Sequence, residues 1–93
     1  MKYKAKVLIS SKNRHLPIAV GYRPHLAKKN SDNLLGVEFI ALSGNDMDEY
    51  VDCIIQTAYS AVGYSDLVDG QKYDVREGRS IVGEIILLEL IQK

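Results

Sequence analysis

Residues 2–9, with the sequence KYKAKVLI, decide the fold class. Lysines alternate strictly with apolar residues at the start of this stretch, so Tyr3, Ala5, Val7 and Ile9 fall on one face. A period of two is typical of a half-buried β-strand, because successive side chains point to opposite faces. We therefore predict a first strand with an apolar inner face and a basic outer face.

Five further segments have the character of strands, with ranges Pro17–Tyr22, Leu34–Leu42, Tyr50–Tyr59, Lys72–Arg76 and Ile81–Ile91. A helix is the alternative at Tyr50–Tyr59, because its apolar residues also fit helical spacing, but the alternation of Val51, Cys53 and Ile55 favours a strand. We expect the last strand to bend at Gly83.

Turn residues separate these segments. The triplet Arg76-Glu77-Gly78 predicts a hairpin turn in which Gly78 adopts a positive φ. Six short strands with tight connections indicate an all-β fold, and a closed barrel removes the exposed edges of such a sheet. The predicted architecture is a small six-stranded antiparallel β-barrel, formed by a single domain spanning residues 1–93.

Composition narrows the class of protein. The 93 residues suffice for one modest core and are too few for most cofactor-binding enzyme folds. A single cysteine, Cys53, excludes an intramolecular disulfide and favours a cytoplasmic location. No apolar run is long enough for a signal peptide or a membrane span.

The formal net charge of zero conceals a strong pattern along the chain. Residues 1–30 contain eight bases and no acid, residues 31–70 contain eight acids and no base, and residues 71–93 contain four of each. We expect these opposite charges to segregate to different faces of the folded domain.

Two stretches carry a family resemblance: RHLPIAVGYRPHL at residues 14–26 and GQKYDVREGRSIVG at residues 70–83. Their order and spacing resemble the C-terminal (third) domain of bacterial translation elongation factor Tu, which has an Arg-His-x-Pro segment, a Gly-Tyr-Arg-Pro segment and a later Arg-Glu-Gly turn. The resemblance extends over nearly the whole chain, although residues 43–69 match the family poorly. It implies a six-stranded antiparallel barrel.

The resemblance also implies a site for tRNA, because that domain contacts the T-stem backbone. Its Arg-Glu-Gly contact is kept here as Arg76, Glu77 and Gly78. Two other contacts are altered, since His25 replaces a glutamine and Leu35 replaces a threonine. The chain has no Gly-x-x-x-x-Gly-Lys-Ser/Thr phosphate loop, so it lacks the GTPase chemistry of the full factor.

Several basic residues are candidates for contact with RNA or with a protein partner, and each has a structural alternative. Arg76 and Arg79 flank the hairpin tip, where they can contact phosphates, remain as solvated turn charges or pair with Glu77. Lys2, Lys4 and Lys6 line one strand face and can follow a phosphate backbone or protect an edge strand. The candidates are Arg76, Glu77, Gly78, Arg79, Arg23, His25, Lys4 and Lys6.

The remaining reactive side chains favour structural roles. His15 and His25 lack the spacing of a ligand pair, and Cys53 fits a buried core thiol. Most of the tyrosines fit the core or its rim, although some can stack on bases, and the acidic residues 46–52 lack the spacing of a calcium loop. We expect no cofactor, no metal, no membrane contact and no small-molecule substrate.

These observations lead to two hypotheses. In the first, the chain is a non-catalytic binding module, similar to the tRNA-binding elongation-factor domain, that contacts RNA or a translation-associated protein. In the second, it is a protein-interaction, inhibitor or immunity-like module that mimics the elongation-factor domain without binding RNA. A small enzyme has the least support, because the sequence does not assemble a nucleophile, a base and an orienting group.

Overall fold

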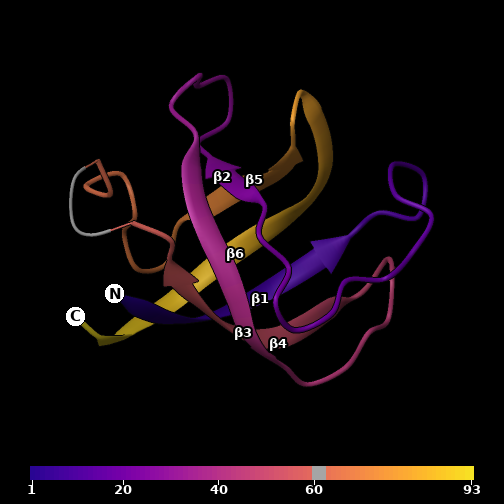
Figure 1. The fold of residues 1–93 in the computed structure, drawn as a ribbon, viewed down its shortest axis with the longest axis horizontal. Coiled ribbons are helices and arrows are strands. Elements are labelled where there is room, and N and C mark those ends of the chain that lie inside the picture. Colours follow the sequence, from indigo (N-terminus) through magenta and orange to yellow (C-terminus); the bar gives the residue numbers. More distant parts are fainter. Residues whose placement is uncertain (60–62) are drawn as a thin grey trace.

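The computed structural model describes residues 1–59 and 63–93, and they form strands and loops. The strands are β1 (Lys2–Ile9), β2 (His25–Ala27), β3 (Leu35–Leu42), β4 (Tyr50–Thr57), β5 (Lys72–Glu77) and β6 (Ser80–Gln92). They close into an antiparallel barrel in the order β1-β4-β3-β2-β5-β6 (Figure 1). The predicted all-β six-stranded antiparallel barrel is confirmed.

The first strand closes the barrel, because β1 pairs with β4 on one side and with β6 on the other. Tyr3, Ala5, Val7 and Ile9 are buried, as the alternation predicts. The suggestion that lysines protect β1 as an edge strand is wrong, because both of its edges are hydrogen-bonded. In the strand order, β2 lies opposite β1.

Strand β4 resolves the choice between helix and strand in favour of the strand. Val51, Cys53 and Ile55 are buried, and the residues between them are more exposed. Phe39 of β3 faces the same core from the neighbouring strand and is fully buried. Such side chains supply most of the stability of the barrel, at about 1.5–3 kcal/mol for each large apolar group buried.

The predicted strand at Pro17–Tyr22 is wrong, and the second strand begins at His25 instead. A tight turn occupies the earlier segment, since Tyr22 N donates to Ala19 O at 3.1 Å and Gly21 has a φ of 97°. Residues 21–24 then run beside β3 through separate hydrogen bonds, without forming a regular strand. The turn explains the error, because it interrupts an apolar run that otherwise reads as extended chain.

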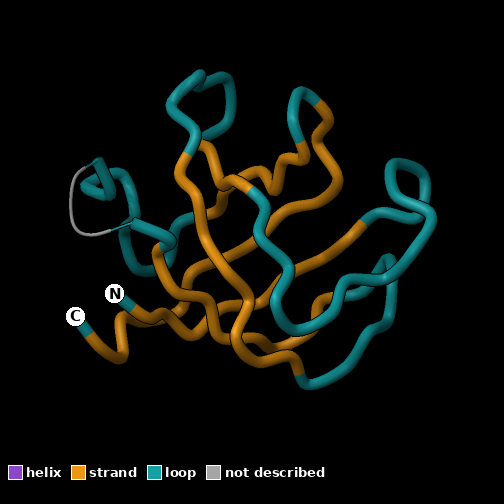
Figure 2. Tube along the Cα trace, in the orientation of Figure 1, coloured by secondary structure: helices purple, strands orange, loops and turns teal. Residues whose placement is uncertain are grey.

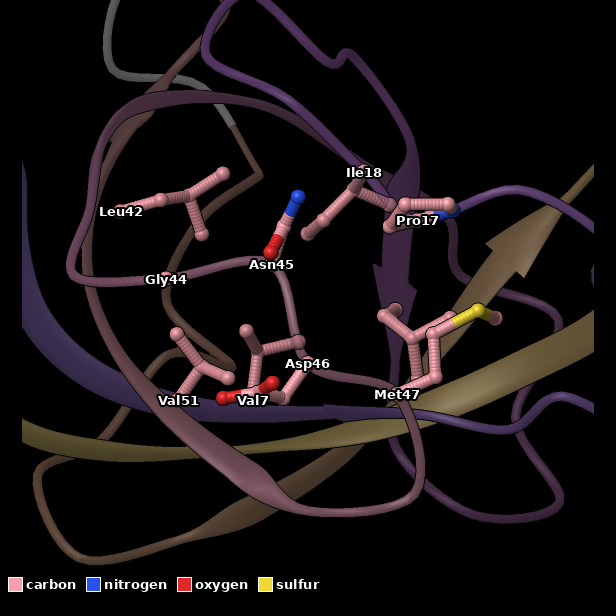
Figure 3. Close-up of a pocket in the computed structure, with 10 residues that line it drawn as sticks. Val7, Pro17, Ile18, Leu42, Gly44, Asn45, Asp46, Met47 and Val51 are labelled. Carbon is pink, nitrogen blue, oxygen red and sulfur yellow. The ribbon is translucent and has the colours of Figure 1, made fainter.

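Loops close the ends of the barrel (Figure 2). At one end Ile18, from the loop after β1, and Met47, from the loop after β3, pack over Val7 and Val51 (Figure 3). The space left between them is about 10 Å³, which accommodates at most about one water molecule. This interior therefore has no room for an organic ligand.

Buried tyrosines anchor the connection between β4 and β5. Tyr64 is buried and its hydroxyl donates to Gly36 O at 2.7 Å. The hydroxyl of Tyr73 donates to Asp66 O and accepts a hydrogen bond from Val68 N at 2.8 Å. Backbone groups of β3 and of the connection therefore form hydrogen bonds with both phenolic hydroxyls, and these bonds hold the connection against the barrel.

Strand β6 curves from the hairpin across the barrel, and Gly83 lies within its first half (Figure 1). A Cβ at Gly83 would overlap the carbonyl oxygen of Leu8 in β1. The register between β5 and β6 also shifts beside this position, where Val75 pairs with Gly83 and Arg76 pairs with Ile81. Only glycine lets β6 approach β1 this closely.

We predict that Gly83→Ala destabilises the domain by about 3 kcal/mol, because the methyl group must displace the backbone of β1. Equilibrium urea unfolding measures the change. Gly44→Ala is the matched control, since the nearest atom to its added Cβ is Asp46 Oδ2 at 3.8 Å, and we expect a change within about 0.5 kcal/mol. Equal stability of the two variants would contradict the close approach.

Candidate functional site

The motifs noted in the sequence meet around the carboxylate of Glu77. Glu77 Oε2 accepts a hydrogen bond from Tyr22 Oη at 2.6 Å and one from Arg14 Nε at 2.7 Å. The Arg14 guanidinium also lies over the Tyr22 ring, with Cζ 5.1 Å from the ring centroid. Two segments distant in sequence, the connection between β1 and β2 and the end of β5, therefore share one polar cluster.

Arg14 extends this cluster into the loop after β1. Its Nη1 donates to the carbonyl oxygens of Leu16 and Pro17. These bonds fix the loop immediately before Ile18, which plugs the end of the barrel. The cluster thus joins the β5–β6 hairpin to the 10–24 loop, and Glu77 is engaged within the molecule.

The cluster shifts the acidity of its members. The hydrogen bond from Tyr22 is the largest factor that lowers the pKa of Glu77, and Arg14 lowers it further. Burial is the main factor that raises the pKa of Tyr22, followed by its bond to Glu77. Both shifts favour an ionised Glu77 beside a neutral tyrosine and a charged arginine.

Arg76 lies in β5 and points away from this cluster. Its Nη2 is 3.6 Å from Asp74 Oδ2, and the two side chains are only 15% and 16% exposed. Arg76 Nε is buried and has no hydrogen-bond partner among the described residues. The alternative in which Arg76 pairs with Glu77 is wrong, because Glu77 pairs with Arg14 and Arg76 pairs with Asp74.

The hairpin tip and the loop before β3 enclose a hollow. Arg76, Gly78 and Arg79 line it from the hairpin, and Asp32 and Leu34 line it from the loop. Figure 1 shows the hairpin and the 28–34 loop side by side at one end of the molecule. As predicted, Gly78 adopts a positive φ, which is 61°.

A second hollow adjoins the first, since Leu34 lines both. His25 of β2 and Tyr59 line it as well, and His25 lies in register between Gly36 of β3 and Arg76 of β5. The ring of Tyr59 is 71% exposed and lies over Gly36, where a Cβ would be 3.1 Å from Tyr59 Cε2. The name hairpin face is used below for the surface formed by His25, Leu34, Tyr59, Arg76 and Arg79.

Some of the residues that the sequence predicts as partner contacts lie on the hairpin face, and others lie elsewhere. Leu35, which replaces the threonine of the elongation-factor domain, is 3% exposed, so its side chain packs in the core. Arg23 pairs with Glu38 at 3.4 Å, outside both hollows. Lys4 and Lys6 lie on β1, opposite β2 in the strand order.

Leu34 and Asp32 were missed in the sequence. The prediction placed Leu34 inside the third strand, but β3 begins one residue later and Leu34 is 43% exposed. The residues Asn30 to Asn33 carry turn chemistry, and Asn30 adopts a φ of 64°. That signal locates a loop, but it does not show that the loop faces the hairpin.

The expected segregation of charge is wrong. At least five of the eight bases in residues 1–30 pair with acids from later in the chain. The pairs are Lys4–Glu89, Lys6–Asp52, Arg14–Glu77, Arg23–Glu38 and Lys28–Asp66. Antiparallel pairing places the basic β1 between β4 and β6, which contribute Asp52 and Glu89, so opposite charges interleave on the surface.

The other reactive side chains occupy structural positions. Cys53 is buried, and burial is the main factor that raises its pKa to about 12. His15 is exposed in a loop. Asp48 accepts a hydrogen bond from Ser11 N at 3.0 Å, and hydrogen bonding by the side chain and then the backbone of Ser11 lowers the pKa of its carboxyl group. Within residues 1–59 and 63–93, no three His, Cys, Asp or Glu side chains gather as metal ligands.

Comparisons with known proteins add no relative. No protein-family model matches the chain, and the search of curated proteins gives no match. Among the described residues there is also no helix long and apolar enough to cross a membrane. The resemblance to the elongation-factor domain therefore remains a hypothesis that rests on the motifs.

We predict that Glu77→Gln lowers the free energy of unfolding at pH 7 by about 1 kcal/mol, because it removes a charged acceptor from a partly exposed cluster. Since the folded pKa is lowered, this stabilisation exists above pH 4.5 and is lost as the pH falls through the folded pKa. Urea unfolding at several pH values should show the two proteins converging in acid.

Glu89→Gln is the matched control for this experiment. Glu89 pairs with Lys4 at 3.8 Å, and both side chains are 58% exposed, so we expect a change below about 0.5 kcal/mol. A Glu77→Gln variant as stable as the control at pH 7 would show that the cluster does not hold the loop.

We also predict that Cys53 reacts with a thiol reagent at pH 8 roughly a hundredfold or more slowly in the native protein than in urea, because the buried thiol stays protonated. Absorbance of the released chromophore follows the reaction. In a Cys53→Ala background, Leu16→Cys places a thiol at a position that is 70% exposed and should react fast. Equal native rates at the two positions would contradict the burial of Cys53.

Proposed function

We propose that this chain is a non-catalytic binding module that contacts its partner through the hairpin face. One observation carries the proposal: three segments separated in sequence converge there on two adjoining hollows. Arg76 adds to it, because its largely buried guanidinium pairs with one acid at 3.6 Å and its Nε has no partner among the described residues, which is costly to maintain for stability alone.

The first candidate partner is the stem of a structured RNA such as tRNA. The resemblance to the elongation-factor domain implies contacts by the Arg76-Glu77-Gly78 turn and at His25, and three of these four residues line the hollows. Arg79 at the exposed tip can form a bidentate hydrogen-bonded pair with a phosphate. The exposed Tyr59 ring can stack on a base. In this assignment Glu77 positions the hairpin from within the molecule.

A translation-associated protein or another protein is the second candidate, and two observations favour it. Ion pairing offsets many of the bases that would otherwise attract phosphates. The hollow between the hairpin tip and the 28–34 loop also combines the apolar Leu34 with Asp32 and Arg79, a mixture that suits a protein surface. An inhibitor or immunity-like role belongs to this candidate.

The proposal assigns no catalytic step to the chain. Cys53 is buried in β4, and its raised pKa opposes formation of a thiolate. Tyr50 and Glu84 pair with each other at 2.7 Å on the outside of the barrel, away from both hollows. We place the module in the cytoplasm, which agrees with its single free cysteine.

We predict that Arg79→Ala weakens the binding of tRNA about fivefold to tenfold at low salt, because it removes an exposed phosphate contact without disturbing the core. Fluorescence anisotropy of labelled tRNA measures the affinity. Lys12→Ala removes the same charge from an exposed loop residue outside the hairpin face, and we expect less than about a twofold change.

The outcome separates the two partners. Equal losses in Arg79→Ala and Lys12→Ala would indicate unspecific attraction and would contradict the hairpin face as the RNA site. No tRNA binding at low salt would overturn the RNA assignment. In that case, a protein partner captured after nuclease treatment, and lost in Arg79→Ala, would support the second candidate.

A further inference from the structure

A third hollow, of about 500 Å³, lies on the outside of the barrel over β1, β3, β4 and β6. Its apolar lining includes Ala41, Ile54 and Leu88, and Lys4 and Asp52 stand at its margin. Ala41, Ile54 and Lys4 form one continuous row across β3, β4 and β1. The name back face is used below for this surface together with the charged partners of its lining residues, and it is defined by Lys4, Lys6, Ala41, Asp52, Ile54, Leu88 and Glu89.

Leu88 stands out on the back face because a β-bulge places it there. The register between β1 and β6 shifts at this point: Lys4 pairs with Glu89 and Ala5 pairs with Leu87. The additional residue, Leu88, is 43% exposed and lines the hollow beside Ile54. The back face therefore has an apolar projection next to an apolar depression.

The charges on the back face balance. Lys4 lies 3.8 Å from Glu89, and Lys6 lies 3.9 Å from Asp52. All four side chains are at least half exposed, so these pairs are weak and can exchange partners. The surface that matches it in charge must carry the same numbers of bases and acids, and a second copy of this face meets that condition.

We infer that the back face binds a second copy of this chain in a two-fold dimer. A two-fold interface uses the same patch on both partners, so each residue i that contacts j is matched by j contacting i. Leu88 of one copy enters the depression beside Ala41 and Ile54 of the other, and the reverse contact follows by symmetry. The lysines and acids at the margin pair across the axis.

Sedimentation velocity of the full chain across about 1 μM to 1 mM tests this inference. We expect the mass to rise from 10.4 kDa toward twice that value, with Leu88→Lys raising the dissociation constant at least about tenfold. Leu16→Lys is the matched control, since Leu16 is 70% exposed on a loop outside the back face, and it should leave the equilibrium unchanged.

Disulfide trapping tests the geometry. In a Cys53→Ala background, mixed Leu88→Cys and Ala41→Cys variants should form a covalent heterodimer faster than either variant alone. A monomer at every concentration would overturn the inference, as would a dimer that survives Leu88→Lys or is lost in Leu16→Lys. Binding of a different protein by a strictly monomeric chain would also overturn it. Circular dichroism establishes that each variant is folded.

Discussion

The arrangement of the loops depends on the hydrogen bonds that the carboxylate of Glu77 accepts. That carboxylate accepts hydrogen bonds from Tyr22 and Arg14, which come from two points of the long connection between β1 and β2. Arg14 in turn holds the backbone before Ile18, and Ile18 closes one end of the barrel. A single acidic residue thus couples the β5–β6 hairpin to the packing at the end of the barrel that Ile18 closes.

This coupling changes how the motifs are understood. Arg14, Tyr22 and Glu77 belong to the segments that resemble the elongation-factor domain, and here they contact one another. Their contact meets a structural requirement of this fold, because loss of any member leaves a polar or charged group without its partner. Under the proposed function, the residues that contact a partner are their neighbours, above all Arg79 at the tip and Arg76 in β5. Under that proposal, structural and binding residues interleave along one hairpin.

Much of the barrel could be predicted from local patterns, because burial on one face imposes alternation. This holds for β1 and β4, and for the glycine at the hairpin tip. The segment 17–22 could not be predicted, since Ile18 plugs the barrel end and the segment belongs to no strand. The charge distribution also depended on the topology: Lys6 and Lys4 become neighbours of Asp52 and Glu89 only when β1 enters between β4 and β6. For the candidate site, the sequence identified the hairpin but not Asp32 and Leu34, whose contact with it depends on the path of the 28–34 loop.

The position of β1 has a consequence for synthesis of the protein. Its two neighbours are β4 and β6, so the first strand made must wait for the last before the sheet can close. Contacts between distant parts of a chain form slowly, because the intervening loop must first be ordered. While β6 is still within the ribosome, one edge of β1 is unpaired and can pair with another nascent chain. The exposed lysines of β1 then act as gatekeepers against aggregation, a role they lose once the barrel closes and they pair with acids.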